Sequence, residues 1–439
     1  MKWLSLIALL AATFSLVRVM RSRPRAVQIA CLALGFSPFI LGDLHLTMAF
    51  VSWSDWPGFV TGAEFSVVDA LTLSLYFSLP RVQHPLPFRI SFALYLFATL
   101  LSALQAFAPI ASLFYSWQLA RMFLVYVVII RVCARPLHLS ALLKGMSAGL
   151  FLEAIVALWE RFGLGLLQAP GTFGHQNTLG MVTHFSVFPF FALLLSGRVG
   201  WLPFLVLPAG IIIELLTTSR ATIGLALLGY SVVFVLSAVR SWTSRKAITL
   251  VVAIAMGAVV APVALSAIAS RGSVEGSDEE RVALESAASM MLSDHPLGVG
   301  ANNFVIAANT QGYYQRAGVG WYSYCAIVHN VYRLVAAETG YFGLIVFAMF
   351  LLNPMIAAIW CGLRNPKDVR GDLLIGLGAA LLVEYLHNLV EWVFVTDPLQ
   401  YPFAMDIGLV AGLAIQLGYW RQKRAKSPFS LSKSGPAQG

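Results

Sequence analysis

The stretch SRKAITLVVAIAMGAVVAPVALSAI (244–268) decides the fold class, because no charged side chain follows Lys246 within it. A helix needs about 20 consecutive apolar residues to cross the hydrocarbon core of a bilayer. The uncharged part of this stretch is long enough, and two basic residues stand immediately before it. The stretch therefore predicts one transmembrane helix with a basic flank.

Further apolar runs of similar length indicate that this helix is one of many. The chain of 439 residues is 59% hydrophobic, with a mean hydropathy of +0.78, whereas soluble domains are roughly 45–50% apolar. We predict an all-α polytopic membrane protein, a bundle of about 12–13 helices, since the first and third runs are short. The predicted spans are 3–17, 27–44, 64–80, 88–108, 113–133, 141–160, 178–197, 201–216, 220–239, 247–268, 340–362, 372–393 and 402–419.

Basic residues gather on one side of the predicted membrane. Most Lys and Arg lie in alternate gaps between spans, and the intervening gaps carry acidic residues. Short cytoplasmic loops are enriched in Lys and Arg, so the basic side is predicted to be the cytoplasm. The formal charge of +9 is thus an orientation signal, and nucleic-acid binding is not favoured because no single basic face forms.

The four cysteines lie in unrelated positions and predict no disulfide framework, and no Cys/His spacing indicates a metal site.

The order of spans and gaps predicts four regions. The regions are transmembrane helices with two outer motifs (1–268, motifs 171–180 and 215–230), a periplasmic loop or lid with catalytic residues (269–339), C-terminal transmembrane helices (340–420), and a disordered basic cytoplasmic tail (421–439).

A few charged residues fall inside or at the edge of spans, where they are costly and usually face a partner or a polar cavity. Structural pairing is the favoured interpretation for Asp69, Glu153, Glu214 and Glu384. For Arg121, in the middle of a span, substrate binding and structural pairing both stay open. The residues concerned are Asp69, Arg121, Glu153, Glu214, Arg333, Glu338 and Glu384.

Two outer motifs are candidate substrate sites. In GTFGHQNTLG (171–180), three adjacent polar residues begin a span, and donors at a helix start can bind an anion. These residues are His175, Gln176 and Asn177. In TTSRATIG (217–224), hydroxyls including that of Ser219 precede Arg220, whose guanidinium matches phosphate oxygens. The alternatives are a helix cap for the first motif and an interfacial arginine for the second.

The long outer loop holds the remaining candidates. Arg281 begins an amphipathic helix, and His329 and Asn330 stand just before the chain returns to the membrane. A histidine in a polar loop is usually only solvated. His329, however, shares the outer face with Arg220 and His175, and histidine titrates near neutrality, which suits a general base.

The motifs GTFGHQNTLG, TTSRATIG, DHPLGVGANNF and HNVYRLVAAETGYFGL, in this order, resemble the O-antigen ligase family of bacterial envelope glycosyltransferases, which includes many polysaccharide polymerases. The resemblance covers roughly residues 60–415. It implies a helical bundle with one large periplasmic loop (GT-C-like), acting in the inner membrane on glycans linked to undecaprenyl diphosphate without a metal or other cofactor. It further implies that Arg220 and Arg281 hold the donor diphosphate and that His329 activates the acceptor.

The two arginines and the histidine suit glycosyl transfer from a diphosphate-linked donor. A diphosphate is a good leaving group, so cationic stabilisation and a base suffice, and direct attack predicts inversion. The acceptor is either lipid A-core, as for a ligase, or another lipid-linked repeat unit, as for a polymerase. The alternatives are a transporter or flippase of a lipid-linked oligosaccharide and an export scaffold. Both alternatives are less favoured, because Arg220, Arg281 and His329 are all predicted on the outer side of the membrane.

Overall fold

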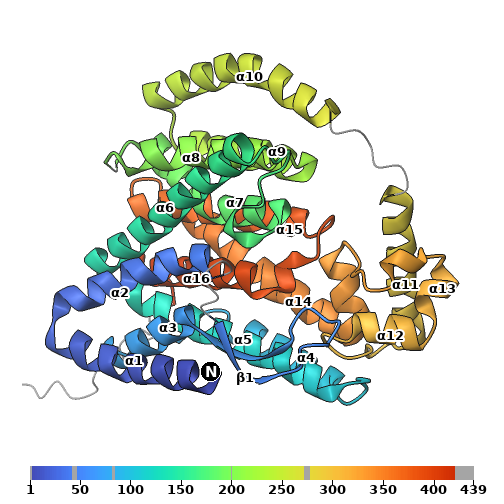
Figure 1. Ribbon diagram of the computed structural model, residues 1–439. Coiled ribbons are helices and arrows are strands. Elements are labelled where there is room, and N and C mark those ends of the chain that lie inside the picture. Colours follow the sequence, from blue (N-terminus) through green and yellow to red (C-terminus); the bar gives the residue numbers. More distant parts are fainter. Residues whose placement is uncertain (1, 42–46, 82–84, 199, 271–276, 421–439) are drawn as a thin grey trace, which may run out of the picture.

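The computed structural model describes residues 2–41, 47–81, 85–198, 200–270 and 277–420. The predicted tail (421–439) and the segment 271–276 of the predicted loop lie outside these residues. Within them, a helix occupies every predicted span, which confirms the all-α polytopic membrane fold (Figure 1). Among the described residues, six helices are long and apolar enough to cross a membrane by length and composition.

The helices of the bundle run close to the predicted spans. α3 has 12 residues and would extend about 18 Å, which is less than the roughly 30 Å of a hydrocarbon core. The bundle helices are α1 (Lys2–Ser22), α2 (Pro24–Phe36), α3 (Val67–Ser78), α4 (Arg89–Ser102), α5 (Pro109–Cys133), α6 (Pro136–Leu158), α7 (Gln176–Ser196), α8 (Leu202–Leu216), α9 (Arg220–Arg240), α10 (Ser244–Ser270), α14 (Val331–Arg364), α15 (Val369–His387) and α16 (Asp397–Gln416).

The gaps that carry the basic residues contact one another in the structure. Arg198, after α7, and Arg240, at the end of α9, both bind Asp372 at the start of α15. At the end of α5, Arg131 donates a hydrogen bond of 2.7 Å to the carbonyl oxygen of Tyr76 in α3. Gaps that alternate along the chain therefore meet at one end of the bundle, as the charge pattern predicts.

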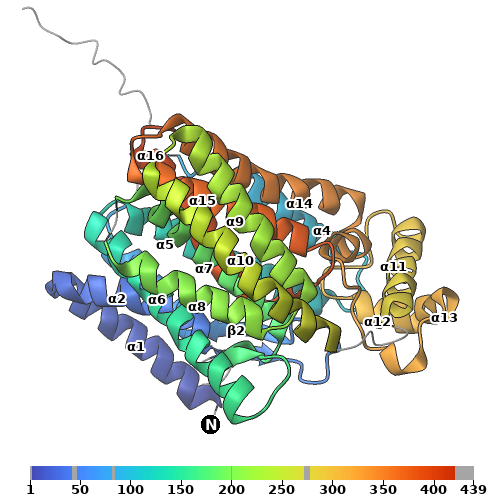
Figure 2. The ribbon, with the colours of Figure 1, turned by 90° about the horizontal axis from the view of Figure 1, so that it is seen from above.

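The predicted lid is helical and adjoins the other end of the bundle. It contains α11 (Ser277–Asp294), α12 (Phe304–Thr310) and α13 (Tyr313–Ala317), which stand together beside the bundle in both views (Figures 1 and 2). α14 begins at Val331, so residues 331–339 of the predicted lid are also helical. A kink at Gly340 (φ 70°) separates them from the predicted span.

Backbone contacts attach the lid to this kink. The amide nitrogens of Val299 and Gly300 donate to the carbonyl oxygens of Ala337 and Glu338 at 3.0 and 2.9 Å. A Cβ atom on Gly340 would lie 2.3 Å from the carbonyl oxygen of Pro296, and the positive φ also favours glycine. Gly340, in the motif HNVYRLVAAETGYFGL, therefore permits the close approach of DHPLGVGANNF.

Two buried asparagines in the same motif connect the lid to the first half of the chain. Asn302 Nδ2 donates to the carbonyl oxygen of Val60 at 2.7 Å, and Asn303 Oδ1 accepts from the amide of Ala108 at 2.9 Å. Val60 follows the first strand of a small antiparallel hairpin, β1 (Thr47–Ser52) and β2 (Gly62–Ser66), which the sequence analysis did not predict. The side-chain amides of Asn302 and Asn303 thus serve as hydrogen-bond partners for loop backbone groups that would otherwise need water.

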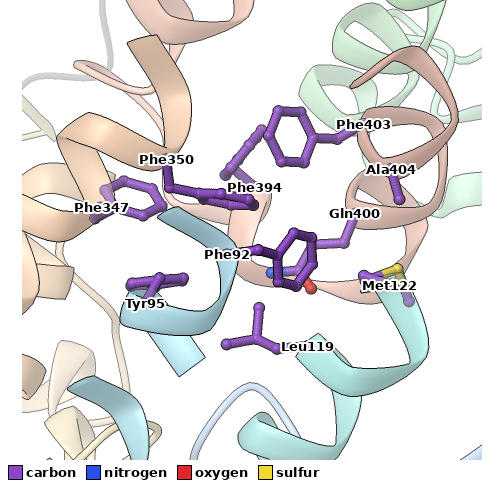
Figure 3. Close-up of a pocket in the computed structure, with 10 residues that line it drawn as sticks. All are labelled: Phe92, Tyr95, Leu119, Met122, Phe347, Phe350, Phe394, Gln400, Phe403 and Ala404. Atoms are coloured by element: carbon purple, nitrogen blue, oxygen red, sulfur yellow. The ribbon is translucent and has the colours of Figure 1, made fainter. Parts of the chain in front are cut away.

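Aromatic side chains pack the interior between α4, α5, α14 and α16 around a small cavity (Figure 3). Its polar side chains, Tyr95 and Gln400, are both hydrogen-bonded to the hydroxyl of Tyr115, at 3.1 and 3.3 Å. A glycan needs many unpaired polar partners, which this lining does not offer. The cavity is therefore a feature of core packing. It is lined by Phe92, Tyr95, Leu119, Met122, Phe347, Phe350, Phe394, Gln400, Phe403 and Ala404.

Candidate active site

The motif GTFGHQNTLG forms a tight turn that places the first residues of α7. Gly171–Phe173 is a 3₁₀ turn, and two buried glutamates of the preceding segment bind its backbone. Thr172 N donates to Glu153 Oε2 at 3.1 Å, and Gly171 N donates to Glu160 Oε2 at 2.8 Å. Glu153 thus has the structural role that the sequence analysis favoured.

His175 and Gln176 lie at the start of α7 and are half-buried. His175 is the N-cap residue, and its backbone carbonyl accepts a hydrogen bond from Leu179 N. Among the described residues, no hydrogen-bond partner lies near the buried Nδ1 atom of His175. The cap interpretation holds for its backbone, and substrate binding by its side chain stays a prediction, as it does for Gln176.

Three residues from distant parts of the chain form a cluster that we call the His329 triad: Asn177, His329 and Glu391. Nδ1 of His329 lies 3.4 Å from Oε1 of Glu391, and Asn177 Nδ2 donates a hydrogen bond to Oε2 of the same carboxylate. The side chain of Glu391 is 1% exposed and that of His329 is 32% exposed. A buried carboxylate therefore contacts a histidine that remains accessible from outside.

The contacts of Glu391 keep it ionised. Burial alone would raise its pKa, but His329, Asn177 and the amide of Trp392 together lower the pKa of Glu391 to about 2. His329 Nδ1 makes no hydrogen bond in the described chain, and the carboxylate of Glu391 is the acceptor 3.4 Å from it. An ionised carboxylate only accepts hydrogen bonds, so a bond between the two requires the His329 tautomer that carries its proton on Nδ1. The Nε2 atom of His329 is then an acceptor, which is the state a general base requires.

Arg220 is the first residue of α9 and its side chain is exposed. Within the described part of the chain it forms no ion pair with an acidic residue, and it adds its charge to a helix N-terminus, which also attracts anions. Ser219 is buried and caps this helix, with its Oγ atom accepting from Thr222 N at 3.3 Å. Thr222 in turn packs on Gly180 of α7, so Arg220 begins beside the helix that carries Asn177.

Arg281 is exposed on α11, in the lid. α11 contacts the first turns of α14 through Arg333, whose Nη1 atom donates to Ser289 Oγ at 3.1 Å. Among residues with described coordinates, no hydrogen bond or ion pair joins Arg281 to Arg220 or His329. Arg220 and Arg281, the two predicted diphosphate ligands, therefore form no ion pair with a carboxylate of the described chain. They also do not contact each other.

Asn330 has a clear structural role beside His329. It is the N-cap residue of α14, and its Oδ1 atom accepts from Arg333 N at 3.1 Å. The next amide, that of Val331, donates to the carbonyl oxygen of Asn388 at 2.9 Å, just beyond α15. These bonds fix the backbone at His329, and a substrate contact from Asn330 stays a prediction.

Arg121 was left open between substrate binding and structural pairing, and its contacts favour structural pairing. Its side chain is 4% exposed, Nε lies 2.9 Å from Asp69 Oδ2, and Nη1 lies 3.8 Å from Glu64 Oε2. It also donates to the hydroxyl of Tyr401. A guanidinium already neutralised by two carboxylates has little capacity left for a diphosphate.

Comparison with known families decides the type of domain. Residues 203–348 match the family model described as O-antigen ligase. This segment of the chain is similar to the O-antigen ligase domain. A search of curated proteins finds no match to this chain. The resemblance stated from the motifs is thereby confirmed over this segment.

The O-antigen ligase domain runs from α8 through the lid to α14, past the kink at Gly340. It contains Arg220, Arg281 and His329. Asn177 and Glu391, which complete the His329 triad, lie outside it. Sequence reasoning found Asn177 but missed Glu391, because it lay inside the predicted span 372–393. In the structure α15 ends at His387, which leaves Glu391 beyond the helix.

Proposed function

We propose that the chain is a glycosyltransferase that moves a glycan from undecaprenyl diphosphate to an acceptor hydroxyl. The observation that carries this proposal is the His329 triad inside and beside an O-antigen ligase domain. The accessible histidine has a carboxylate beside it that can orient the ring, an arrangement common at general bases of acyl-transfer enzymes. The exposed Arg220 and Arg281 supply positive charge on the same domain.

The proposed reaction is a single inverting displacement. His329 Nε2 takes the proton of the acceptor hydroxyl while that oxygen bonds to the anomeric carbon of the donor glycan. The bond from this carbon to the diphosphate oxygen breaks, and undecaprenyl diphosphate leaves with the electron pair. Arg220 and Arg281 stabilise the charge that develops on the diphosphate, and Glu391 stabilises the imidazolium.

Reconstitution with candidate acceptors tests this proposal and its alternative. Purified protein in liposomes should transfer glycan from an undecaprenyl diphosphate donor to lipid A-core or to a second lipid-linked repeat unit, and the productive acceptor distinguishes ligase from polymerase. Added Mg²⁺ or Mn²⁺ should leave the rate unchanged. Movement of the intact donor across the bilayer without any glycan transfer would instead establish the flippase.

A matched substitution tests the role of Glu391. Glu391→Gln should lower turnover by about 10- to 100-fold, because a charge-assisted contact worth roughly 1.5–3 kcal/mol is lost. The acid limb of the pH–rate profile should move to lower pH, since a carboxylate favours the protonated imidazole and the amide does not. Asp55→Asn, at an exposed outer-loop position, is the control and should change neither. An unshifted acid limb in Glu391→Gln would contradict the assignment.

We further propose that the triad faces the periplasm from the bacterial inner membrane. Cysteine labelling tests this orientation at two exposed positions, Thr310 at the end of α12 and Ala134 after α5, in a chain without its native cysteines. An impermeant reagent on intact spheroplasts should label Thr310→Cys and spare Ala134→Cys. The reverse pattern would place the site in the cytoplasm and exclude a periplasmic transferase.

A further inference from the structure

A second polar cluster lies between α7 and α15, inside the bundle. His184 on α7 and Glu384 and His387 on α15 have no exposed surface. Nδ1 of His184 lies 3.1 Å from Oε1 of Glu384, and one potential ligand atom from each of the three residues lies within 4.8 Å of the others. Glu384 and His387 are three residues apart, so they share one face of α15.

Several polar atoms in this cluster have no partner. In the described chain, hydrogen bonds reach neither Glu384 Oε2 nor either ring nitrogen of His387. The His184 ring, in contrast, lies beside the backbone of Thr222. Buried polar atoms in folded proteins are nearly always hydrogen-bonded, so several orphans at one place need an explanation. A bound ion that accepts electron pairs would satisfy them together.

The local charge also favours a cation. Asp406 on α16 is fully buried, both its carboxylate oxygens lack a partner, and it lies within electrostatic range of Glu384. Neither carboxylate pairs with a Lys or Arg among the described residues. A divalent cation would balance both carboxylates, and buried charges are normally paired or bound to metal.

We propose that His184, Glu384 and His387 bind a divalent transition-metal ion, with Zn²⁺ preferred, which joins α7 to α15. Two imidazoles and one carboxylate are the protein ligands of known zinc sites in which a non-protein ligand such as water completes the tetrahedron, whereas Mg²⁺ and Ca²⁺ prefer oxygen ligands. The ion stabilises the last turn of α15, next to Asn388, whose carbonyl holds Val331 N. This metal is structural and independent of the proposed glycosyl transfer, in which no metal contacts the diphosphate.

Metal content and affinity of the full-length protein test the site directly. Purified protein should contain about one Zn²⁺ per chain by elemental analysis and should rebind it after stripping with a strong chelator. His387→Ala and Glu384→Gln should weaken Zn²⁺ binding by about 10- to 100-fold or more and abolish its effect on Tm. His138→Ala, a buried imidazole on α6 outside the cluster, should bind Zn²⁺ like wild type.

Cobalt titration of the wild-type protein keeps the proposal testable if the variants do not fold. Stripped protein should bind Co²⁺ with the intense visible absorption of a low-coordinate site. A stripped protein that binds neither Zn²⁺ nor Co²⁺, or a folded His387→Ala variant that retains wild-type Zn²⁺ affinity, would overturn the proposal. The cluster would then be a buried polar group that holds no ion.

Discussion

Replacing His329 with alanine should lower turnover by about 10²–10⁴-fold and leave donor affinity close to the wild-type value. The reason is geometric. Glu391 occupies the Nδ1 side of the ring, so Nε2 is the atom left to take a proton, and removal of a base affects the chemical step rather than diphosphate binding. Single-turnover kinetics and donor titration on the same reconstituted protein measure the two quantities separately.

His295→Ala is the matched control for this substitution. His295 lies in the same lid, and its Nε2 atom contacts Gln311 Oε1 at 2.9 Å rather than an ionised carboxylate. Loss of the His295 side chain should change turnover little. The wild-type rate should also rise with pH between about 5.5 and 7.5, where histidines ordinarily lose their proton. If His329→Ala weakens donor binding in proportion to its rate loss, His329 is a phosphate ligand instead of a base.

Arg220→Lys and Arg281→Lys should each lower kcat/KM by about 10- to 100-fold. Lysine keeps the charge but loses the planar fork that donates two parallel hydrogen bonds to a phosphate, and charge-assisted bonds are worth roughly 1.5–3 kcal/mol. Both arginines are exposed and free of carboxylate partners within the described chain, so the loss should fall on the substrate rather than on stability.

Arg316→Lys provides the comparison, because Arg316 is an exposed lid arginine whose Nη1 atom lies 3.1 Å from Asp294. This variant should retain wild-type turnover and donor affinity. The measurement is donor affinity and turnover for all three folded variants. Values near wild type for both Arg220→Lys and Arg281→Lys would remove diphosphate binding from their roles, whereas loss in only one would assign the diphosphate to that arginine.

The sequence alone determined the fold class and the order of the helices. Long uncharged runs have few alternatives in a bilayer, because backbone polar groups there must be satisfied within the helix. The alternation of basic gaps placed the ends of α7 and α9 and the start of α15 on one side, and the contacts of Arg198 and Arg240 with Asp372 agree with this. The predicted span that begins at 340 matches the kink at Gly340, but the start of α14 at Val331 and the hairpin at 47–66 were missed, because they depend on backbone contacts with distant segments.

Tertiary structure decided how polar side chains are partnered. Local sequence showed that Arg121, Asn177 and His329 were unusual. It could not show that Arg121 pairs with Asp69 while Arg220 forms no ion pair with any described carboxylate. Glu391 contacts Asn177 across 214 positions of the chain, and His184 meets Glu384 across 200. Pairings at such separations depend on which helix faces pack together, and the apolar periodicity of a single helix carries no information about its partner.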